Sequence, residues 1–278
     1  MHCEVNVTKN NKVLTAVIAV LSLLIAGCGG FLLYQHFNNQ PSEQVPTEPS
    51  SSAITTVAET TEAPTEATEQ TEGTTVPPEP NPIDFARWQD AENDDIYSWI
   101  QVPNTEIDYP VLQSKPDYDD NFYLDHGLDK DYRFAGSIYS QRANAQDYSD
   151  RVTVLYGHNM RDGSMFATLH WFADPDFFSE NTAMTVYTPD KQLDYEIVAG
   201  IEYGSDHILN THDFSDDAVY QRFLDEVILD SSAGNIRDGV TLDVSDRILI
   251  LSTCQNWGDG RYLVVGRLVR ETPLYAAE

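Results

Sequence analysis

Cys254 is the residue of this chain whose chemistry is most informative. The sequence holds three cysteines, and the other two, Cys3 and Cys28, lie before or inside an apolar segment near the N-terminus. Cys254 follows the strand-like run Ile248–Thr253, and Arg261 stands seven positions after it. Because the thiolate is the reactive form and nearby positive charge favours it, this pattern is typical of an activated nucleophile. A buried structural thiol is the alternative interpretation.

A base for this thiol has to come from the seven histidines. His2 and His36 precede the region that could fold. Four others stand in polar, loop-like surroundings that are typical of solvated residues: His126, His170, His207 and His212. His158 differs because it follows the apolar run Val154–Tyr156 through Gly157. A histidine delivered by a strand end, at the mouth of a barrel, is well placed to face another strand end such as Cys254.

An uncharged apolar segment near the N-terminus predicts a transmembrane anchor over residues 13–34. At about 1.5 Å per residue, a helix of this length spans a hydrocarbon core of about 30 Å. Lys9 and Lys12 precede the segment, and no Lys or Arg follows it until Arg87. The positive-inside bias therefore places residues 1–12 in the cytoplasm and the rest outside the cell. We expect a single-pass protein of the cell membrane with an extracellular C-terminal domain.

Cys28 offers a second form of attachment to the membrane. The run Ile25–Cys28 resembles a bacterial lipoprotein processing site, in which Cys28 would carry the lipid. Residues 31–34 continue the apolar run, and this continuation favours an uncleaved anchor. Both interpretations tether the chain to the outer face of a membrane.

Composition changes abruptly after the apolar segment. Residues 35–82 are rich in Thr, Glu, Pro, Ser and Ala, and from Gln40 onward they contain no Lys, Arg or aromatic residue. Such a stretch buries too little apolar surface to offset its ordering entropy, so we expect a disordered stalk. Residues 83–278 are long enough for one domain with its own hydrophobic core.

The chain is strongly acidic, with a formal net charge of −29 at pH 7. Nucleic acids require Lys and Arg to neutralise their phosphates, so this charge argues against a nucleic-acid partner. The sequence carries no paired-cysteine, His-Glu-x-x-His or calcium-loop motif, no phosphate-binding glycine loop and no Gly-x-Ser-x-Gly elbow. We expect neither a metal nor another cofactor.

Short strands dominate the predicted secondary structure of the domain. Eight apolar segments are separated by Pro, Gly, Asn and Asp: 99–102, 107–111, 137–139, 153–156, 184–187, 193–203, 247–252 and 262–269. The seventh is apolar at consecutive positions, which predicts a strand covered on both faces. A helix is predicted over 84–100, where the polar middle can break it in two. Many short strands with few helices predict a closed barrel or a sandwich.

A second helix is predicted over residues 215–229. Ser215 serves as its N-cap, and acidic residues fill the first turn. Val219, Phe223 and Val227 are spaced to form its buried stripe.

Three separated motifs resemble those of the sortase family, and their residues are most similar to those of class B. They are Tyr156–Met160, Leu251–Cys254 and Arg261–Gly266. Further stretches similar to class B in wording and order are 99–100, 107–111, 135–139 and 162–166. The resemblance covers nearly all of the domain from about residue 83.

The resemblance implies a mainly β fold: a closed eight-stranded sortase-type β-barrel with N-terminal helices and a helix inserted before the penultimate strand. It also implies that Cys254, His158 and Arg261 are catalytic. Cys254 would attack the carbonyl carbon of Thr in a C-terminal sorting signal, and His158 would protonate the departing amine. Arg261 would donate hydrogen bonds to the oxyanion or hold the substrate backbone. The gap between Cys254 and Arg261 is short for the family.

The resemblance further implies the partners of the reaction. The acyl donors would be surface proteins or pilins with sorting signals of the Asn-Pro or Ser-Pro type, and the acceptor an amine of a peptidoglycan precursor or a pilin lysine. Tyr156, Ser252 and Thr253 flank the two catalytic strand ends and are candidate substrate-binding residues, with ordinary packing as the alternative. The anchor and stalk fit a surface enzyme of a Gram-positive bacterium.

Other function classes stay open at this point. A papain-like Cys–His peptidoglycan endopeptidase would place its cysteine before its histidine and at the start of a helix, whereas here His158 comes first and Cys254 ends a strand. An L,D-transpeptidase would carry a Ser-His-Gly-Cys cluster, which the sequence lacks. A non-catalytic surface binding barrel is the non-enzymatic alternative.

Overall fold

The computed structural model describes residues 78–229, 232, 234–255 and 259–276, all within the second of two compact units of the chain, Thr71–Glu278. The predicted cytoplasmic segment, the anchor over 13–34 and most of the stalk lie outside the described residues, so these stay predictions. None of the helices in the described part is both long and apolar enough to span a membrane.

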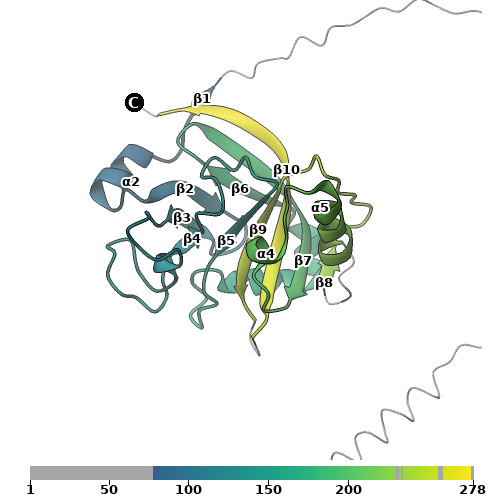
Figure 1. Ribbon diagram of the computed structural model, residues 1–278. Coiled ribbons are helices and arrows are strands. Elements are labelled where there is room, and N and C mark those ends of the chain that lie inside the picture. Colours follow the sequence, from purple (N-terminus) through teal and green to yellow (C-terminus); the bar gives the residue numbers. More distant parts are fainter. Residues whose placement is uncertain (1–77, 230–231, 233, 256–258, 277–278) are drawn as a thin grey trace, which may run out of the picture. The chain divides into compact units, whose positions relative to one another are not determined.

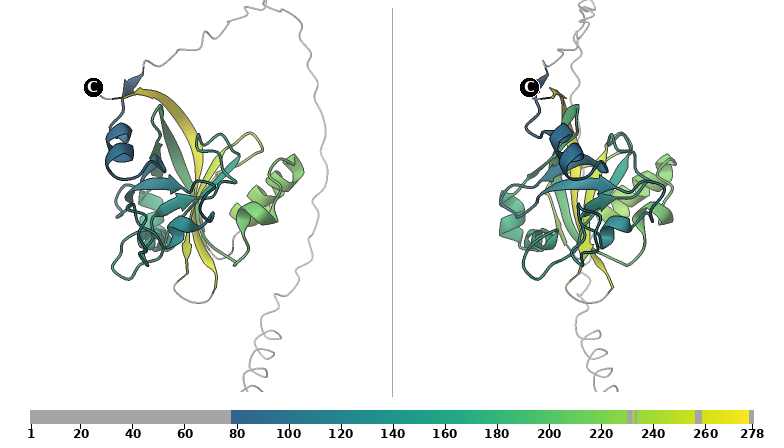
Figure 2. Two further views of the ribbon diagram at one scale, coloured as in Figure 1. Left: turned by 60° about the vertical axis from the view of Figure 1, so that its left-hand side comes forward. Right: turned by 90° about the vertical axis from the view of Figure 1, so that its left-hand side faces the viewer.

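Eight strands close into a barrel, shown from three directions in Figures 1 and 2. The order of the ten described strands is β1-β10-β9-β5-β4-β3-β2-β6-β7-β8, and the ring closes because β10 pairs with both β9 and β7. The strands are β1 Glu79–Pro80, β2 Ile96–Gln101, β3 Asp108–Gln113, β4 Ile138–Ser140, β5 Val152–Tyr156, β6 Ala183–Tyr187, β7 Lys191–Tyr203, β8 Gly234–Ile236, β9 Ile248–Cys254 and β10 Arg261–Tyr275. The short strands β1 and β8 add to the outside of this ring.

The helices are short and lie around the barrel. They are α2 Phe85–Ala91, α3 Pro175–Glu180, α4 Ile208–Thr211 and α5 Asp217–Phe223, with 3-10 helices η1 Phe122–Leu124 and η2 Ala167–Ala173 and the π-helix η3 Leu224–Ile228. In Figure 2, α2 (blue) and α5 (light green) lie on opposite sides of the barrel. The helix α5–η3 precedes β9, the penultimate strand, so the mainly β barrel with an inserted helix is confirmed.

Each of the eight predicted strands corresponds to one strand of the barrel, with ends that differ by a few residues. The helix predicted over 84–100 is observed only as α2. The chain turns at Asn93, whose Oδ1 accepts a hydrogen bond from the Asp95 backbone N–H at 2.9 Å, and β2 begins at Ile96. The polar middle of the segment therefore ends the helix, as its composition allowed.

The N-cap predicted for the second helix is wrong by one residue. Asp216 caps α5, because its carboxylate accepts from the backbone N–H groups of Ala218 and Val219, while the Ser215 hydroxyl donates to Asp213. The buried stripe is shifted as well and consists of Tyr220, Phe223, Leu224 and Ile228. The π-helical turn, in which Leu229 N bonds Leu224 O, changes the period on which the predicted stripe depended.

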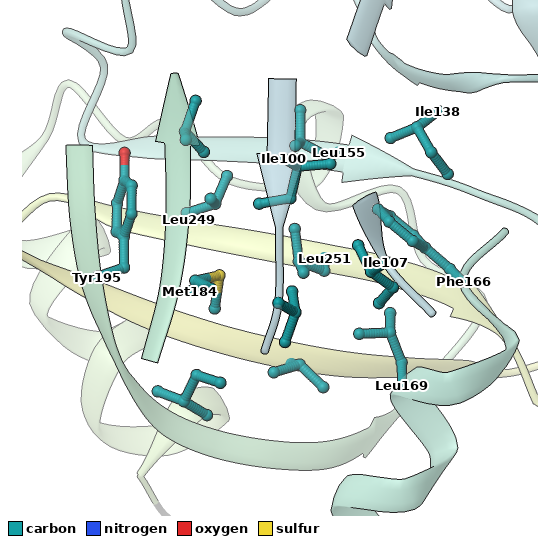
Figure 3. Close-up of a cluster of buried hydrophobic side chains, with 14 of the residues drawn as sticks. Ile100, Ile107, Ile138, Leu155, Phe166, Leu169, Met184, Tyr195, Leu249 and Leu251 are labelled. Atoms are coloured by element: carbon teal, nitrogen blue, oxygen red, sulfur yellow. The ribbon is translucent and has the colours of Figure 1, made fainter. Parts of the chain in front are cut away.

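The interior of the barrel is one hydrophobic cluster with members from all eight closing strands (Figure 3). One member from each is Ile100, Val111, Ile138, Leu155, Met184, Tyr195, Leu251 and Val264. Phe166, which precedes η2, and Leu169, within η2, also pack there. This cluster fixes which side chains of each strand point inward.

Strand β9 is buried on both faces, as its run of apolar residues predicted. Leu249 and Leu251 belong to the barrel interior, whereas Ile248 and Ile250 belong to a second cluster with the stripe of α5–η3. Side chains alternate between faces with a period of two, so the even-numbered residues of β9 point outward. Cys254 continues this outer series.

Leu251→Ala should lower the free energy of unfolding by about 2–5 kcal/mol, because it leaves a cavity inside the closed barrel, where Leu251 is fully buried. Denaturant unfolding followed by circular dichroism measures the change. Val269→Ala on the exposed side of β10 is the matched control and should change stability by less than about 0.5 kcal/mol. Equal losses in the two variants would contradict the assignment of Leu251 to the core.

Candidate active site

Cys254 and Arg261 are directly opposite each other at the ends of β9 and β10. Arg261 Nη1 lies 3.8 Å from Cys254 Sγ, and the same nitrogen donates to the carbonyls of Asp259 and Gly260 at 3.2 and 3.3 Å. These carbonyls hold the guanidinium beside the sulfur. The short gap between the two residues is thus compatible with a directly opposite cross-strand pair, and the exposed Cys254 is not a buried structural thiol.

His158 reaches the same edge of the barrel because β5 and β9 are parallel neighbours. Tyr156 is in register with Ser252, and the pairing continues as Gly157 N donates to Ser252 O at 3.1 Å. His158 and Cys254 each stand two residues beyond that register pair. Two parallel strands that end at the same level place the residues after their ends side by side.

A glycine is required between β5 and the histidine. A Cβ atom at Gly157 would come within 2.5 Å of Ile138 Cδ1 and 2.8 Å of the Phe166 ring, both of which are barrel-interior residues. Those contacts are closer than carbon atoms can approach without displacement. Gly157 therefore lets β5 stay against the core while His158 leaves it.

The His158 imidazole is held by a loop that lies before β4. His158 Nε2 is 2.8 Å from the carbonyl oxygen of Leu124, and the ring stacks on Phe134 with centroids 5.5 Å apart. A carbonyl only accepts hydrogen bonds, so Nε2 carries a proton and Nδ1 is the nitrogen left for proton transfer. Among the described contacts there is no hydrogen bond between His158 and Cys254, and such bonds often form only when a substrate is bound.

The three residues line a pocket of about 270 Å³ on the outer face of the barrel. Tyr139, Tyr156 and Tyr203 form its aromatic walls, and the segment Ser205–Ile208, which leads into α4, lines it as well. The thiol and the imidazole therefore share one pocket at the strand ends, and its walls come from the outer side of the barrel. The alternation along β9 directs Cys254 outward, away from the filled interior.

The candidate substrate-binding residues Tyr156, Ser252 and Thr253 all line this pocket. The Tyr156 hydroxyl is buried and has no hydrogen-bond partner among the described atoms. Burial raises the pKa of Tyr156, and the positive charge of Arg261 opposes that shift only in part, so the phenol stays neutral and able to donate. Ser252 and Thr253 line the pocket although both are buried.

The sequence missed two side chains that contact the backbone of the cysteine. His170 Nε2 lies 3.0 Å and Asn159 Nδ2 lies 3.2 Å from the Cys254 carbonyl oxygen. His170 also packs on the Tyr262 ring at 5.0 Å between centroids, so its assignment to the solvated surface was wrong. No sequence signal marked it, because η2, on which it stands, was not predicted.

His207 and Leu124 are further members of the site that the sequence did not single out. His207 lines the pocket at 6.3 Å from the Tyr156 ring, and its Nδ1 accepts from the backbone of Asn210 at the start of α4. Leu124 contributes through its backbone oxygen, which residue type does not reveal. Within the described range, no group of three or more His, Cys, Asp or Glu side chains is arranged to hold a metal ion.

Comparison with known proteins identifies relatives of this chain. A family model described as a Sortase domain matches residues 100–269. Sortase B of Listeria monocytogenes is 36% identical over 186 residues, which cover 64% of this chain and 71% of the relative. Sortase B of Staphylococcus aureus is 33% identical over 167 residues, which cover 59% of this chain and 65% of the relative.

Solved structures give the same result. The X-ray structure of Clostridium perfringens sortase B superposes with a TM-score of 0.60 at 33% identity and covers 67% of this chain and all of that one. A Staphylococcus aureus sortase B–substrate complex superposes with a TM-score of 0.58 at 29% identity and covers 67% of this chain and 84% of that one.

Arg261→Gln should slow the alkylation of Cys254 by iodoacetamide about five-fold at neutral pH, because it removes the positive charge that stabilises a thiolate. Mass spectrometry of the peptide that contains Cys254 measures the rate. Arg222→Gln, an exposed arginine on α5, is the matched control and should leave the rate unchanged. An unchanged rate in Arg261→Gln would mean that the guanidinium does not act on the sulfur.

Proposed function

Because this chain belongs to the sortase family, and within it to class B, it is a cysteine transpeptidase, and we propose that it cleaves C-terminal sorting signals after Thr and passes the acyl group to an amine of a cell-wall precursor or pilin. The observation that carries the proposal is the shared edge of β5, β9 and β10. It brings the exposed thiol of Cys254 beside a guanidinium at 3.8 Å and into one pocket with an imidazole.

Cys254 is the proposed nucleophile. Its sulfur attacks the carbonyl carbon of the Thr residue, the C–N bond breaks, and a thioester remains on the enzyme. His158 gives a proton to the departing amine and later takes one from the incoming amine. The proton on Nε2, which the Leu124 carbonyl holds, stays on the ring throughout, so the ring is positively charged before it gives the Nδ1 proton and neutral until it takes one from the incoming amine.

Arg261 is the proposed oxyanion donor. Its guanidinium is fixed by the carbonyls of Asp259 and Gly260, so it needs little reorganisation when charge develops on the substrate oxygen. Tyr156, Ser252 and Thr253 are the proposed substrate contacts. The aromatic walls of their pocket suit an extended peptide, and the Staphylococcus aureus relative has been solved as a substrate complex.

The proposed cellular setting rests on the sequence before the barrel. Residues 1–12 lie in the cytoplasm, 13–34 anchor the chain, 35–82 form the stalk, and 83–278 form the catalytic domain outside the cell. The described fold reaches slightly into the stalk range, since β1 pairs with the end of β10. Lys9 and Lys12 before the uncharged apolar segment, and the absence of Lys and Arg after it until Arg87, support this arrangement.

Cys254→Ala should abolish thioester formation and transfer, while the melting temperature stays within a few degrees because the side chain is exposed. The assay mixes the protein with sorting-signal peptides of the Asn-Pro and Ser-Pro types and with hydroxylamine, and follows the hydroxamate by mass spectrometry. Normal hydroxamate formation by the variant would remove Cys254 from its role. Hydrolysis in place of capture by the wild-type protein would indicate an endopeptidase.

The rate of transfer should follow a bell-shaped pH profile. The thiol has to be deprotonated while the imidazole is protonated, so activity falls at acidic pH as the thiolate is lost and at basic pH as the imidazolium is lost. Initial rates at saturating peptide between about pH 5 and pH 10 measure the profile. A flat profile across that range would contradict two titrating partners.

A further inference from the structure

A second hollow reaches the reactive cysteine. Its volume is about 390 Å³, and it is lined by Cys254 and Gln255 together with Ala167 and turn residues Asn159–Arg161 and Gly163. Among the residues that line the described hollows, Cys254 is the one shared by this hollow and the 270 Å³ pocket. The two openings therefore meet at one residue.

A transpeptidase needs two such openings. After the first step the acyl group stays bound to sulfur, and the pocket that recognised the sorting signal remains occupied by it. The amine that resolves the thioester has to approach the same carbonyl carbon from elsewhere, since that pocket is filled. The second hollow offers an approach that leaves the acyl group in place.

The end of β9 that both hollows share is held in place. Asn159 Nδ2 and His170 Nε2 both lie within hydrogen-bond distance of the Cys254 carbonyl oxygen, at 3.2 and 3.0 Å. These contacts tie the end of β9 to the segment after His158. The cysteine therefore keeps its place with respect to both openings.

The second hollow carries a positive charge that forms no ion pair within the described part of the chain. Arg161 is exposed, and no acidic side chain in the described part of the chain forms an ion pair with it. Its neighbour Asp162 instead accepts hydrogen bonds from the backbone and the hydroxyl of Ser164 at 3.1 and 2.6 Å, which lower the pKa of Asp162. In a chain with a formal net charge of −29, an arginine without a carboxylate is free to bind one from a ligand.

The turn that presents Arg161 is rigid. Gly163 N donates to Met160 O at 3.1 Å, which places Arg161 at a central position of a four-residue turn. Gly163 has a φ of +85°, a conformation that favours glycine, and Phe166 N closes the loop on His158 O at 2.9 Å. The guanidinium thus projects from a loop whose backbone is fixed beside His158.

Resting on the proposed function, we infer that this second hollow is the acceptor site, and that Arg161 selects an amine whose neighbouring carbon bears a carboxylate. The guanidinium pairs with the carboxylate and, as a like charge, disfavours the ammonium form of the amine, which has to lose a proton before it can react. The amine nitrogen then attacks the thioester carbonyl, a C–N bond forms, the C–S bond breaks, and the amine proton passes to His158. A protein lysine has no carboxylate beside its amine and fits this site less well.

The test compares two acceptors that differ only in the carboxylate. Glycine and glycinamide are supplied separately to the full chain with a sorting-signal peptide, and the KM for each is measured from the transfer product by mass spectrometry. Arg161→Gln should raise the KM for glycine about five-fold, as expected for the loss of one exposed ion pair, and that for glycinamide less than about two-fold. Arg161→Lys should leave the KM for glycine close to the wild-type value. Intrinsic differences in amine reactivity cancel, because each acceptor is compared between variants.

Arg87→Gln provides the matched control, since Arg87 is exposed on α2 and lines neither hollow. It should change neither KM. Equal effects of Arg161→Gln on the two acceptors, or no effect on either, would overturn the inference while thioester formation by the wild-type protein still supports the proposed function. If the protein prefers Nα-acetyl-lysinamide as acceptor, and the KM for this acceptor does not depend on Arg161, the inference is overturned and a protein lysine is the acceptor. Failure of the wild-type protein to form a thioester would overturn the proposed function and the inference with it.

Discussion

The parallel pairing of β5 with β9 is the contact on which the site depends. The register Tyr156–Ser252 sets the level at which both strands leave the barrel, so the imidazole and the thiol emerge together. The long stretch of chain between them forms β6, β7 and the helices that cover β9 from outside. A slip of β9 by one residue would turn its inward leucines outward and its cysteine inward. Full burial on both faces of β9 opposes that slip.

The strand pairings of β10 both close the barrel and set the position of Arg261. Strand β10 pairs with β9 along Arg261–Arg267 and with β7 along almost its whole length. Arg261 is therefore in register with Cys254 on one side and with Tyr203 on the other. Arg261, whose guanidinium lies 3.8 Å from the sulfur, is positioned by the strand that completes the ring, which links the stability of the fold to the geometry of the pocket.

Strand positions could be predicted from the sequence because apolar runs and turn residues are local signals. His158 and Cys254 could be found because each follows such a run. Which strands would become neighbours could not be predicted from periodicity, since pairing between distant segments leaves no local mark. His170 and the Leu124 carbonyl were missed for related reasons. His170 stands on a 3-10 helix that was not predicted, and Leu124 contributes a backbone atom.

The pairing of β1 with the far end of β10 bears on how the enzyme would withstand mechanical tension. Glu79 and Pro80 lie beside Leu274 and Tyr275, and Asn81 adds bonds to Tyr275 and Thr188. A pull on the chain at residue 78 would first strain this two-residue strand, at the opposite end of β10 from Arg261. A ladder of two residue pairs would break before the eight-stranded ring. The pairing of β1 with β10 would therefore separate first under tension, and the strand ends that carry Cys254 and Arg261 would stay undistorted.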